Sequence, residues 1–159
     1  MTVTIRDAAR SDAPRILKFI IDLAEYEKLG DEAVATVEDI ERDLFGASPK
    51  VFCQIAEWNG EPAGFALWFY TYSTFLGRLG LWLEDLFVDP DMRGHGIGKA
   101  LLTNLAQRCL AEGLGRLEWN VLDWNQPSIE FYRSQGAVFM DGWRGCRVSG
   151  EALNRLGAK

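Results

Sequence analysis

The 159-residue chain is poor in the residues that build metal sites and disulfide frameworks. It has one histidine and three widely spaced cysteines, with no Cys-x-x-Cys pair, so the sequence indicates neither zinc nor structural disulfides. No apolar run approaches the roughly 18–20 residues of a membrane span. Residues 1–6 also lack the pattern of a signal peptide. We therefore expect a cytoplasmic protein with no metal and no membrane partner.

Basic residues are also in deficit, because 17 lysines and arginines face 23 acidic residues, for a net charge of −6. Nonspecific nucleic-acid binding needs a basic surface, so we expect no nucleic-acid partner. The acidity is concentrated between Asp22 and Asp43, where nine acidic residues face two basic ones. This segment is either a solvated helix face and loop or a negative field that attracts a cationic substrate.

The length is that of one domain, so we expect a single domain over residues 1–159. Alternating apolar residues predict strands at 3–6, 51–58, 63–72, 79–88, 116–122, 137–140 and 144–148, of which the last two form a closing hairpin. Helical spacing predicts a first helix after Ser11, its N-cap. A second helix is predicted from the capping box of Thr36 and Asp39 to Gly46. Further helices are predicted from Ile97 to Gly113, at 128–135 and, as a short helix, at the end of the chain. Asn59-Gly60 predicts a tight turn. This order predicts an α+β fold in which helices cover a mixed sheet.

A glycine-rich loop, Arg93-Gly94-His95-Gly96-Ile97-Gly98, lies between a predicted strand and a predicted helix. Glycines let the backbone approach a ligand closely, and the unpaired N–H groups of a helix start attract anions. Arg93 can add a charged fork to a phosphate. The sequence therefore predicts a phosphate site formed by this loop and by Lys99, the residue that follows it.

Two common phosphate loops do not fit this sequence. A Walker A loop needs Lys followed by Ser or Thr, but Lys99 is followed by Ala100. A dinucleotide loop needs Gly-x-Gly-x-x-Gly, and counting from Gly94 places Lys99 at the last glycine. The pattern that remains is Arg-x-x-Gly-x-Gly, at Arg93, Gly96 and Gly98.

This pattern resembles the acyl-CoA loop of the GNAT superfamily of N-acetyltransferases. The preceding stretch from Leu83 to Pro90 is similar to the family's bulged central strand, and Asn125 to Ala137, with Phe131-Tyr132, is similar to its second signature. The resemblance runs from Ile5 to Val148. It implies a central, mostly antiparallel sheet flanked by helices, acetyl-CoA as co-substrate, and acetyl transfer to an amine.

Narrower features resemble the diamine and polyamine (spermidine/spermine-type) and thialysine N-acetyltransferases. They are Leu23-Ala24-Glu25-Tyr26-Glu27, Tyr70-Thr71-Tyr72, the strand at 83–88, the loop at 93–98 and Trp124-Asn125-Gln126-Pro127-Ser128. The resemblance implies a homodimer. The polyamine enzymes carry an acid and a tryptophan where this chain has Ser73 and Phe75. That difference favours a smaller amine or an amino-acid side-chain amine as acceptor.

Acetyl transfer to an amine needs a base, because an alkyl amine is mostly protonated at neutral pH. Glu84 is the candidate base and acts through a water molecule. Tyr132 is the candidate acid that protonates the CoA thiolate, because a phenol and an alkyl thiol have similar pKa values. Glu84 and Asp85 point to opposite faces unless a bulge intervenes. The substrate-binding candidates are Tyr26, Glu27, Glu84, Asp85 and Trp124. The cofactor-binding candidates are Leu86, Phe87, Val88, Arg93, Gly94, His95, Gly96, Ile97, Gly98, Lys99, Asn125, Ser128 and Tyr132.

Each assignment has a structural alternative. Glu84 is otherwise a structural carboxylate or only a substrate anchor, and Asp85 a partner in a salt bridge. Tyr132 is otherwise a packed aromatic residue, and Asn125 or Ser128 a helix cap. At the level of function, the alternatives to a small-molecule amine acetyltransferase are a protein or peptide N-acetyltransferase and a non-catalytic CoA-binding dimer.

Overall fold

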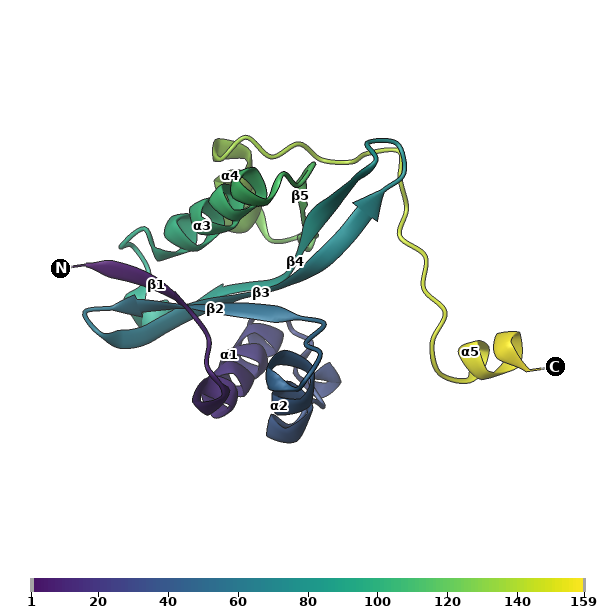
Figure 1. Ribbon diagram of the computed structural model, residues 1–159, viewed down its shortest axis with the longest axis horizontal. Helices are drawn as coiled ribbons and strands as arrows, with labels where there is room; N and C mark the ends of the chain where they lie inside the picture. Colours follow the sequence, from purple (N-terminus) through teal and green to yellow (C-terminus); the bar gives the residue numbers. More distant parts are fainter. Residues whose placement is uncertain (1, 159) are drawn as a thin grey trace. The chain divides into compact units, whose positions relative to one another are not determined.

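The computed structural model describes residues 2–158 (Figure 1). It divides into two compact units, one that ends at Asn120 and one that begins at Val121. The first unit contains the sheet and the predicted phosphate loop, and the second contains the Phe131-Tyr132 segment. Among the described residues, no helix has both the length and the apolar character needed to cross a membrane.

The sheet of the first unit has five strands in the order of the chain. They are β1 (Val3–Asp7), β2 (Phe52–Trp58), β3 (Glu61–Ser73), β4 (Arg78–Val88) and β5 (Leu117–Glu118). The first four pair antiparallel, and β4 and β5 pair parallel. The mixed, mostly antiparallel sheet is therefore confirmed. Asn59 and Gly60 link β2 to β3 with φ of 52° and 84°, as the predicted turn requires.

The helices of the first unit lie on both faces of the sheet (Figure 1): α1 (Ala13–Tyr26) and α2 (Val37–Phe45) on one face, and α3 (Ile97–Glu112) on the other. The capping box of α2 is confirmed, because Thr36 accepts from the Asp39 N–H and Asp39 accepts from the Thr36 N–H. The prediction of Ser11 as the N-cap of α1 was wrong. Residues Arg10–Asp12 form a 3-10 turn, closed by the Asp12 carboxylate on the Ala9 N–H, and Asp12 is the cap.

The core under α1 and α2 is apolar and closely packed. Phe19 stacks on Phe65 with ring centroids 5.4 Å apart and contacts Phe87 at 6.2 Å. The same cluster contains Ala13, Ile16, Ile40, Cys53, Ile55 and Leu67. Burial of these side chains is the main stabilising term for this face. It also fixes the last turn of α1 beside the second half of β4.

A β-bulge interrupts β4 at Glu84. Leu67 of β3 pairs with Asp85, but the next residue, Trp68, pairs with Leu83, so Glu84 has no partner on β3. Directly opposite residues share a face, so Asp85 lies with Leu67 on the α1 face. Glu84 lies there as well, since its carboxylate accepts a bond from Trp82, which faces Phe69. Glu84 and Asp85 therefore lie on the same face of the sheet and not on opposite faces, as expected if a bulge intervenes.

Strand β5 is much shorter than the predicted strand at 116–122. Only Leu117 and Glu118 pair with β4, opposite Leu81 and Trp82. Beyond Trp82, no described strand pairs with this edge of β4. A strand exists only where a second strand completes its hydrogen bonds, so the sequence pattern alone overestimated the length of β5.

The second unit contains α4 (Gln126–Ser134) and α5 (Gly150–Gly157). Both predicted helices are present, although α4 begins earlier than predicted. The predicted closing hairpin was wrong, because residues 137–149 form no strand. Residues 137–149 form no strand hydrogen bonds, and alternating apolar residues alone do not make a sheet.

Candidate functional site

The glycine-rich loop joins the short 3-10 turn Pro90–Met92 to the first turn of α3. Gly94 and Gly96 have φ of 86° and 75°, a region that favours glycine, and space is open where a Cβ would stand at either residue. Gly96 is the N-cap of α3 and provides no side-chain cap, and no acidic residue lies in the first turn. The N–H groups of that turn are thus left for an anion.

Arg93 is oriented differently from the phosphate fork predicted for it. Its Nε donates to the Val88 carbonyl oxygen at 3.1 Å. Its guanidinium carbon lies 5.2 Å from the ring centre of Tyr26 and 5.7 Å from that of Phe87. These are cation–π distances. Arg93 therefore connects the loop to the end of α1, where the substrate candidates Tyr26 and Glu27 lie.

The second half of β4 contains the three strand residues predicted to bind the cofactor. Phe87 is buried in the core, whereas Leu86 and Val88 are partly exposed. On the side away from β3, backbone pairing stops after Trp82. This edge of β4 leads directly into the loop, so an extended ligand lying on the loop can continue along backbone donors and acceptors.

Three carboxylates meet beside this strand. Burial first, and then the negative charges of Glu84 and Glu27, raise the pKa of Asp85 to about 7. Burial and the charge of Glu84 also raise the pKa of Glu27. Glu84 is exposed, and its Oε2 accepts from Trp82 Nε1 at 3.0 Å. The structure thus brings together Glu27, Glu84 and Asp85, with Asp85 the most protected from water.

Most of the acidic segment from Asp22 to Asp43 does not belong to this cluster. Four of its acids form surface ion pairs: Asp22 with Lys18, Glu41 with Arg10, and both Asp39 and Asp43 with Arg42. For those four the solvated-surface interpretation holds. Glu27 is the member of the segment whose carboxyl group faces Glu84 and Asp85.

The remaining predicted site residues lie in the second unit. Asn125 is buried and caps α4, since its Oδ1 accepts from the Ser128 N–H at 3.4 Å. Tyr132 lies on α4 beside Phe131, with ring centroids 5.4 Å apart. Trp124 precedes the helix and is 43% exposed. Asn125 thus caps α4, and catalytic or cofactor-binding roles for Asn125, Ser128, Tyr132 and Trp124 remain predictions.

Sequence reasoning missed Trp58 as a functional candidate. Its indole stacks on the imidazole of His95, with centroids 4.3 Å apart and planes 10° apart. Trp58 and His95 are 37 positions apart in the chain, and only the pairing of β2 with its neighbours brings them together. No local pattern signals this contact.

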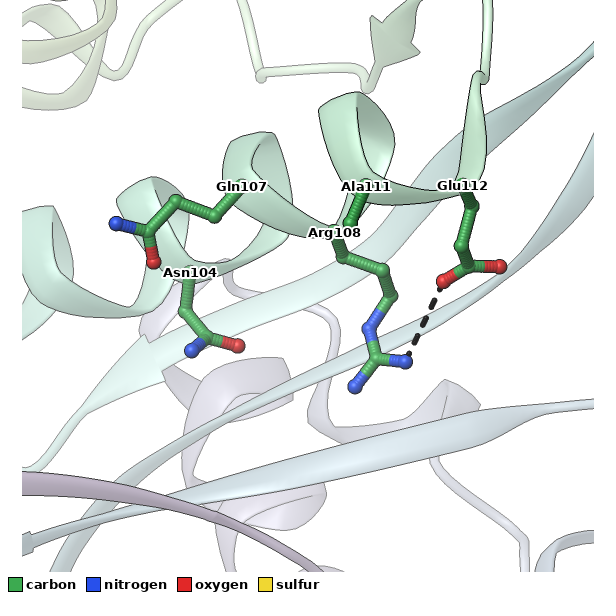
Figure 2. Close-up of a pocket in the computed structure, with 5 residues that line it drawn as sticks. All are labelled: Asn104, Gln107, Arg108, Ala111 and Glu112. Carbon is green, nitrogen blue, oxygen red and sulfur yellow. Dashed lines mark hydrogen bonds and ion pairs between the residues drawn. The ribbon is translucent and has the colours of Figure 1, made fainter.

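A separate hollow of about 310 Å³ lies along α3, two to four turns beyond the loop (Figure 2). It is lined by Asn104, Gln107, Arg108, Ala111 and Glu112. Arg108 is engaged by Glu112, by Asp7 and by the ring of Trp68. Among residues 2–158, no group of three or more His, Cys, Asp or Glu is arranged to hold a metal ion.

Known proteins share this arrangement of a mixed sheet, a glycine-rich loop and a following helix. The model of the acetyltransferase (GNAT) family matches residues 17–137. The chain belongs to this family, whose members use acetyl-CoA as co-substrate, and it is an N-acetyltransferase.

Two curated relatives and one solved structure are similar to the chain over most of its length. The chain is 37% identical to the thialysine N-epsilon-acetyltransferase of Sus scrofa, over 99% of each chain. It is 32% identical to an L-ornithine N5-acetyltransferase of Arabidopsis thaliana, over 96% of this chain and 86% of the relative. An integron cassette protein from the mobile metagenome of V. cholerae has a similar structure, with a TM-score of 0.83 and 26% identity over 100% of this chain and 99% of that one.

Proposed function

We propose that the chain transfers the acetyl group of acetyl-CoA to the primary amine of a small cationic acceptor. The observation that carries this proposal is the bulge at Glu84, which turns two consecutive carboxylates to the α1 face beside Glu27. Three carboxyl groups at the end of the strand that leads into the phosphate loop favour an ammonium group there. A side-chain amine of an amino acid, of the lysine or ornithine type, fits this small cluster.

Two further observations support an amino-acid amine over a polyamine. The pig and Arabidopsis relatives are named for a lysine analogue and for ornithine. Ser73 is buried and closes the turn between β3 and β4 by accepting from the Leu76 N–H at 3.1 Å, while Phe75 at the tip is 98% exposed. Neither residue provides an anionic anchor for a distant second ammonium group.

The chemical step we propose is direct attack. The neutral amine nitrogen adds to the thioester carbonyl, the amine proton passes through water to Glu84, and the carbon–sulfur bond breaks. Tyr132 then gives its proton to the CoA thiolate. Tyr26, Glu27, Asp85 and Trp124 bind the acceptor, and the backbone N–H of Leu86 or a neighbour stabilises the oxyanion.

For the cofactor, we propose that the loop from Arg93 to Lys99 holds the pyrophosphate with its backbone N–H groups. The edge of β4 at Leu86, Phe87 and Val88 pairs with pantetheine. Asn125, Ser128 and Tyr132 complete the cofactor site. The capless first turn of α3 and the open space at Gly94 and Gly96 support this assignment.

The test is a thiol-release assay with acetyl-CoA against diamines, polyamines, ornithine, lysine, thialysine and lysine-containing peptides. We expect turnover with lysine-like or ornithine-like amines and much weaker turnover with spermidine. Turnover with peptides alone would replace the proposal by a protein N-acetyltransferase. Tight CoA binding with no turnover on any amine would leave a non-catalytic CoA-binding protein.

We also propose that the chain acts as a homodimer. Each unit exposes large apolar side chains: Tyr72, Phe75, Leu76 and Leu79 in the first, and Val138, Met140, Trp143, Val148, Leu153 and Leu156 in the second. Exposed large apolar side chains that gather into a patch mark protein–protein interfaces, and a second copy of the chain would cover them. Light scattering after gel filtration tests this: we expect twice the chain mass for wild type and for the control Asp141→Lys, and the chain mass for Trp143→Glu. A monomeric wild type would overturn the proposal.

The chain is further proposed to be one acetyltransferase domain over residues 1–159, located in the cytoplasm. The family model spans residues 17–137 and so crosses the border between the two units. The cysteines Cys53, Cys109 and Cys146 are free thiols, which suits a reducing compartment. Limited proteolysis should release no stable fragment that ends near residue 120, and fractionation of cells should recover the protein with the cytosol.

A further inference from the structure

The stack of Trp58 on His95 joins the end of β2 to the phosphate loop. The two rings lie nearly parallel, 10° apart, at a centroid distance of 4.3 Å. This separation is shorter than the 5.4 Å between the stacked rings of Phe19 and Phe65 in the core. A contact of this kind contributes beyond simple burial.

Trp58 is firmly held. As the last residue of β2, it pairs with Val3 on one side and Glu61 on the other. The turn that follows is fixed to the start of β1, because the Asn59 N–H donates to the Thr2 carbonyl and the Thr2 N–H donates to Asn59 Oδ1. The indole is therefore a platform whose position is set by three strands.

His95 has no such support from its own backbone. It is exposed, and its neighbours Gly94 and Gly96 both have positive φ with open space around them. A segment with glycine on both sides of one residue has high conformational entropy, and ordering it on ligand binding costs free energy. The stack removes part of that freedom before any ligand arrives.

We propose that Trp58 is a positioning residue for acetyl-CoA, which acts through His95 to hold the phosphate loop in its binding conformation. This inference rests on the proposed role of the loop in binding the pyrophosphate. Arg93 anchors the loop on its other side, through Val88 and Tyr26. The loop is thus held by ring contacts at His95 and Arg93, while no side chain caps the first turn of α3.

The decisive experiment is a double-mutant cycle on CoA affinity, measured by calorimetry, with acetyl-transfer kinetics beside it. Trp58→Ala should raise the Kd for CoA, and the KM for acetyl-CoA, about 3- to 10-fold, the factor expected for loss of one ring contact. The kcat at saturating acetyl-CoA should stay within about twofold of wild type. Trp58→Phe, which keeps an aromatic platform, should restore most of the affinity. Glu61→Ala, on the same hairpin, is the matched control.

The cycle separates positioning from a general loss of structure. In a His95→Ala background, Trp58→Ala should have no further effect, because the contact is already gone. An undiminished effect in that background, or wild-type affinity in Trp58→Ala alone, would overturn the inference. If the wild type itself fails to bind CoA, the proposed function fails instead.

One measurement needs no variant at Trp58. His95 is the only histidine in the chain, so its imidazole gives one unambiguous set of NMR signals. Stacking on an indole shifts these protons upfield, and we expect that shift in the free protein. Signals at the positions of an unstacked histidine, in free protein that binds CoA, would contradict a preformed loop.

Discussion

Replacing Asp85 with asparagine should flatten the dependence of stability on pH. In the folded chain, burial and the charges of Glu84 and Glu27 raise the pKa of Asp85 from 3.8 to about 7. The folded state therefore keeps a proton that the unfolded chain loses. A carboxyl group with a raised folded pKa favours folding at low pH, and that contribution is lost as pH rises from about 4 to about 7.

The size of the effect follows from the shift. One pKa unit corresponds to about 1.4 kcal/mol, so between pH 5 and pH 7 the ionisation of Asp85 costs the wild type at most about 2.7 kcal/mol. Water that reaches the carboxyl group and movement of Glu27 reduce this value. We expect the wild type to lose about 1–2 kcal/mol more than Asp85→Asn over that interval, because asparagine is isosteric and does not ionise.

The assay is urea unfolding followed by tryptophan fluorescence at pH 5, 6, 7 and 8, without ligand. Asp31→Asn, in an exposed turn, is the control and should follow the wild type. The difference in unfolding free energy between Asp85→Asn and wild type should grow in favour of the variant as pH rises. Parallel pH curves for the two proteins would refute the raised pKa of Asp85.

Other predictions concern chemistry, the loop and the scaffold. Glu84→Gln and Tyr132→Phe should each lower kcat by about 10²-fold or more, with CoA affinity by calorimetry intact in Glu84→Gln, and full activity in both would refute the proposed mechanism. Arg93→Lys keeps the charge but loses the planar contact with Tyr26, so the unfolding free energy should fall by about 1 kcal/mol; an unchanged value would contradict that contact. Thr36→Ala removes the cap of α2 and should cost about 1 kcal/mol in chemical denaturation with unchanged kcat, whereas a fall in kcat would show that α2 matters for the reaction.

The parts of the fold that could be predicted from sequence are those set by local chemistry. The capping box of Thr36 and Asp39, the turn at Asn59-Gly60 and the end of α3 at Gly113 each depend on residues close together in the chain. The loop from Arg93 to Gly98 was likewise found from its spacing. Its family could be named because a second motif lay downstream.

What could not be predicted depends on contacts between distant residues. A strand needs a partner strand. Of the strand predicted at 116–122, only the two paired residues of β5 form, and the strands predicted at 137–140 and 144–148 do not form. The bulge at Glu84 is a mismatch of register between β3 and β4, which neither strand shows alone. The stack of Trp58 on His95 and the turn of Arg93 toward Tyr26 also require the folded sheet.

The shortness of β5 has a consequence for handling the protein. The edge of β4 beyond Trp82 presents backbone donors and acceptors that no described strand satisfies. To another polypeptide such an edge is a template for strand addition, and so a starting point for aggregation. A ligand on the edge blocks this route. The proposed pairing of pantetheine with β4 therefore predicts that preparations stripped of CoA precipitate sooner than loaded ones.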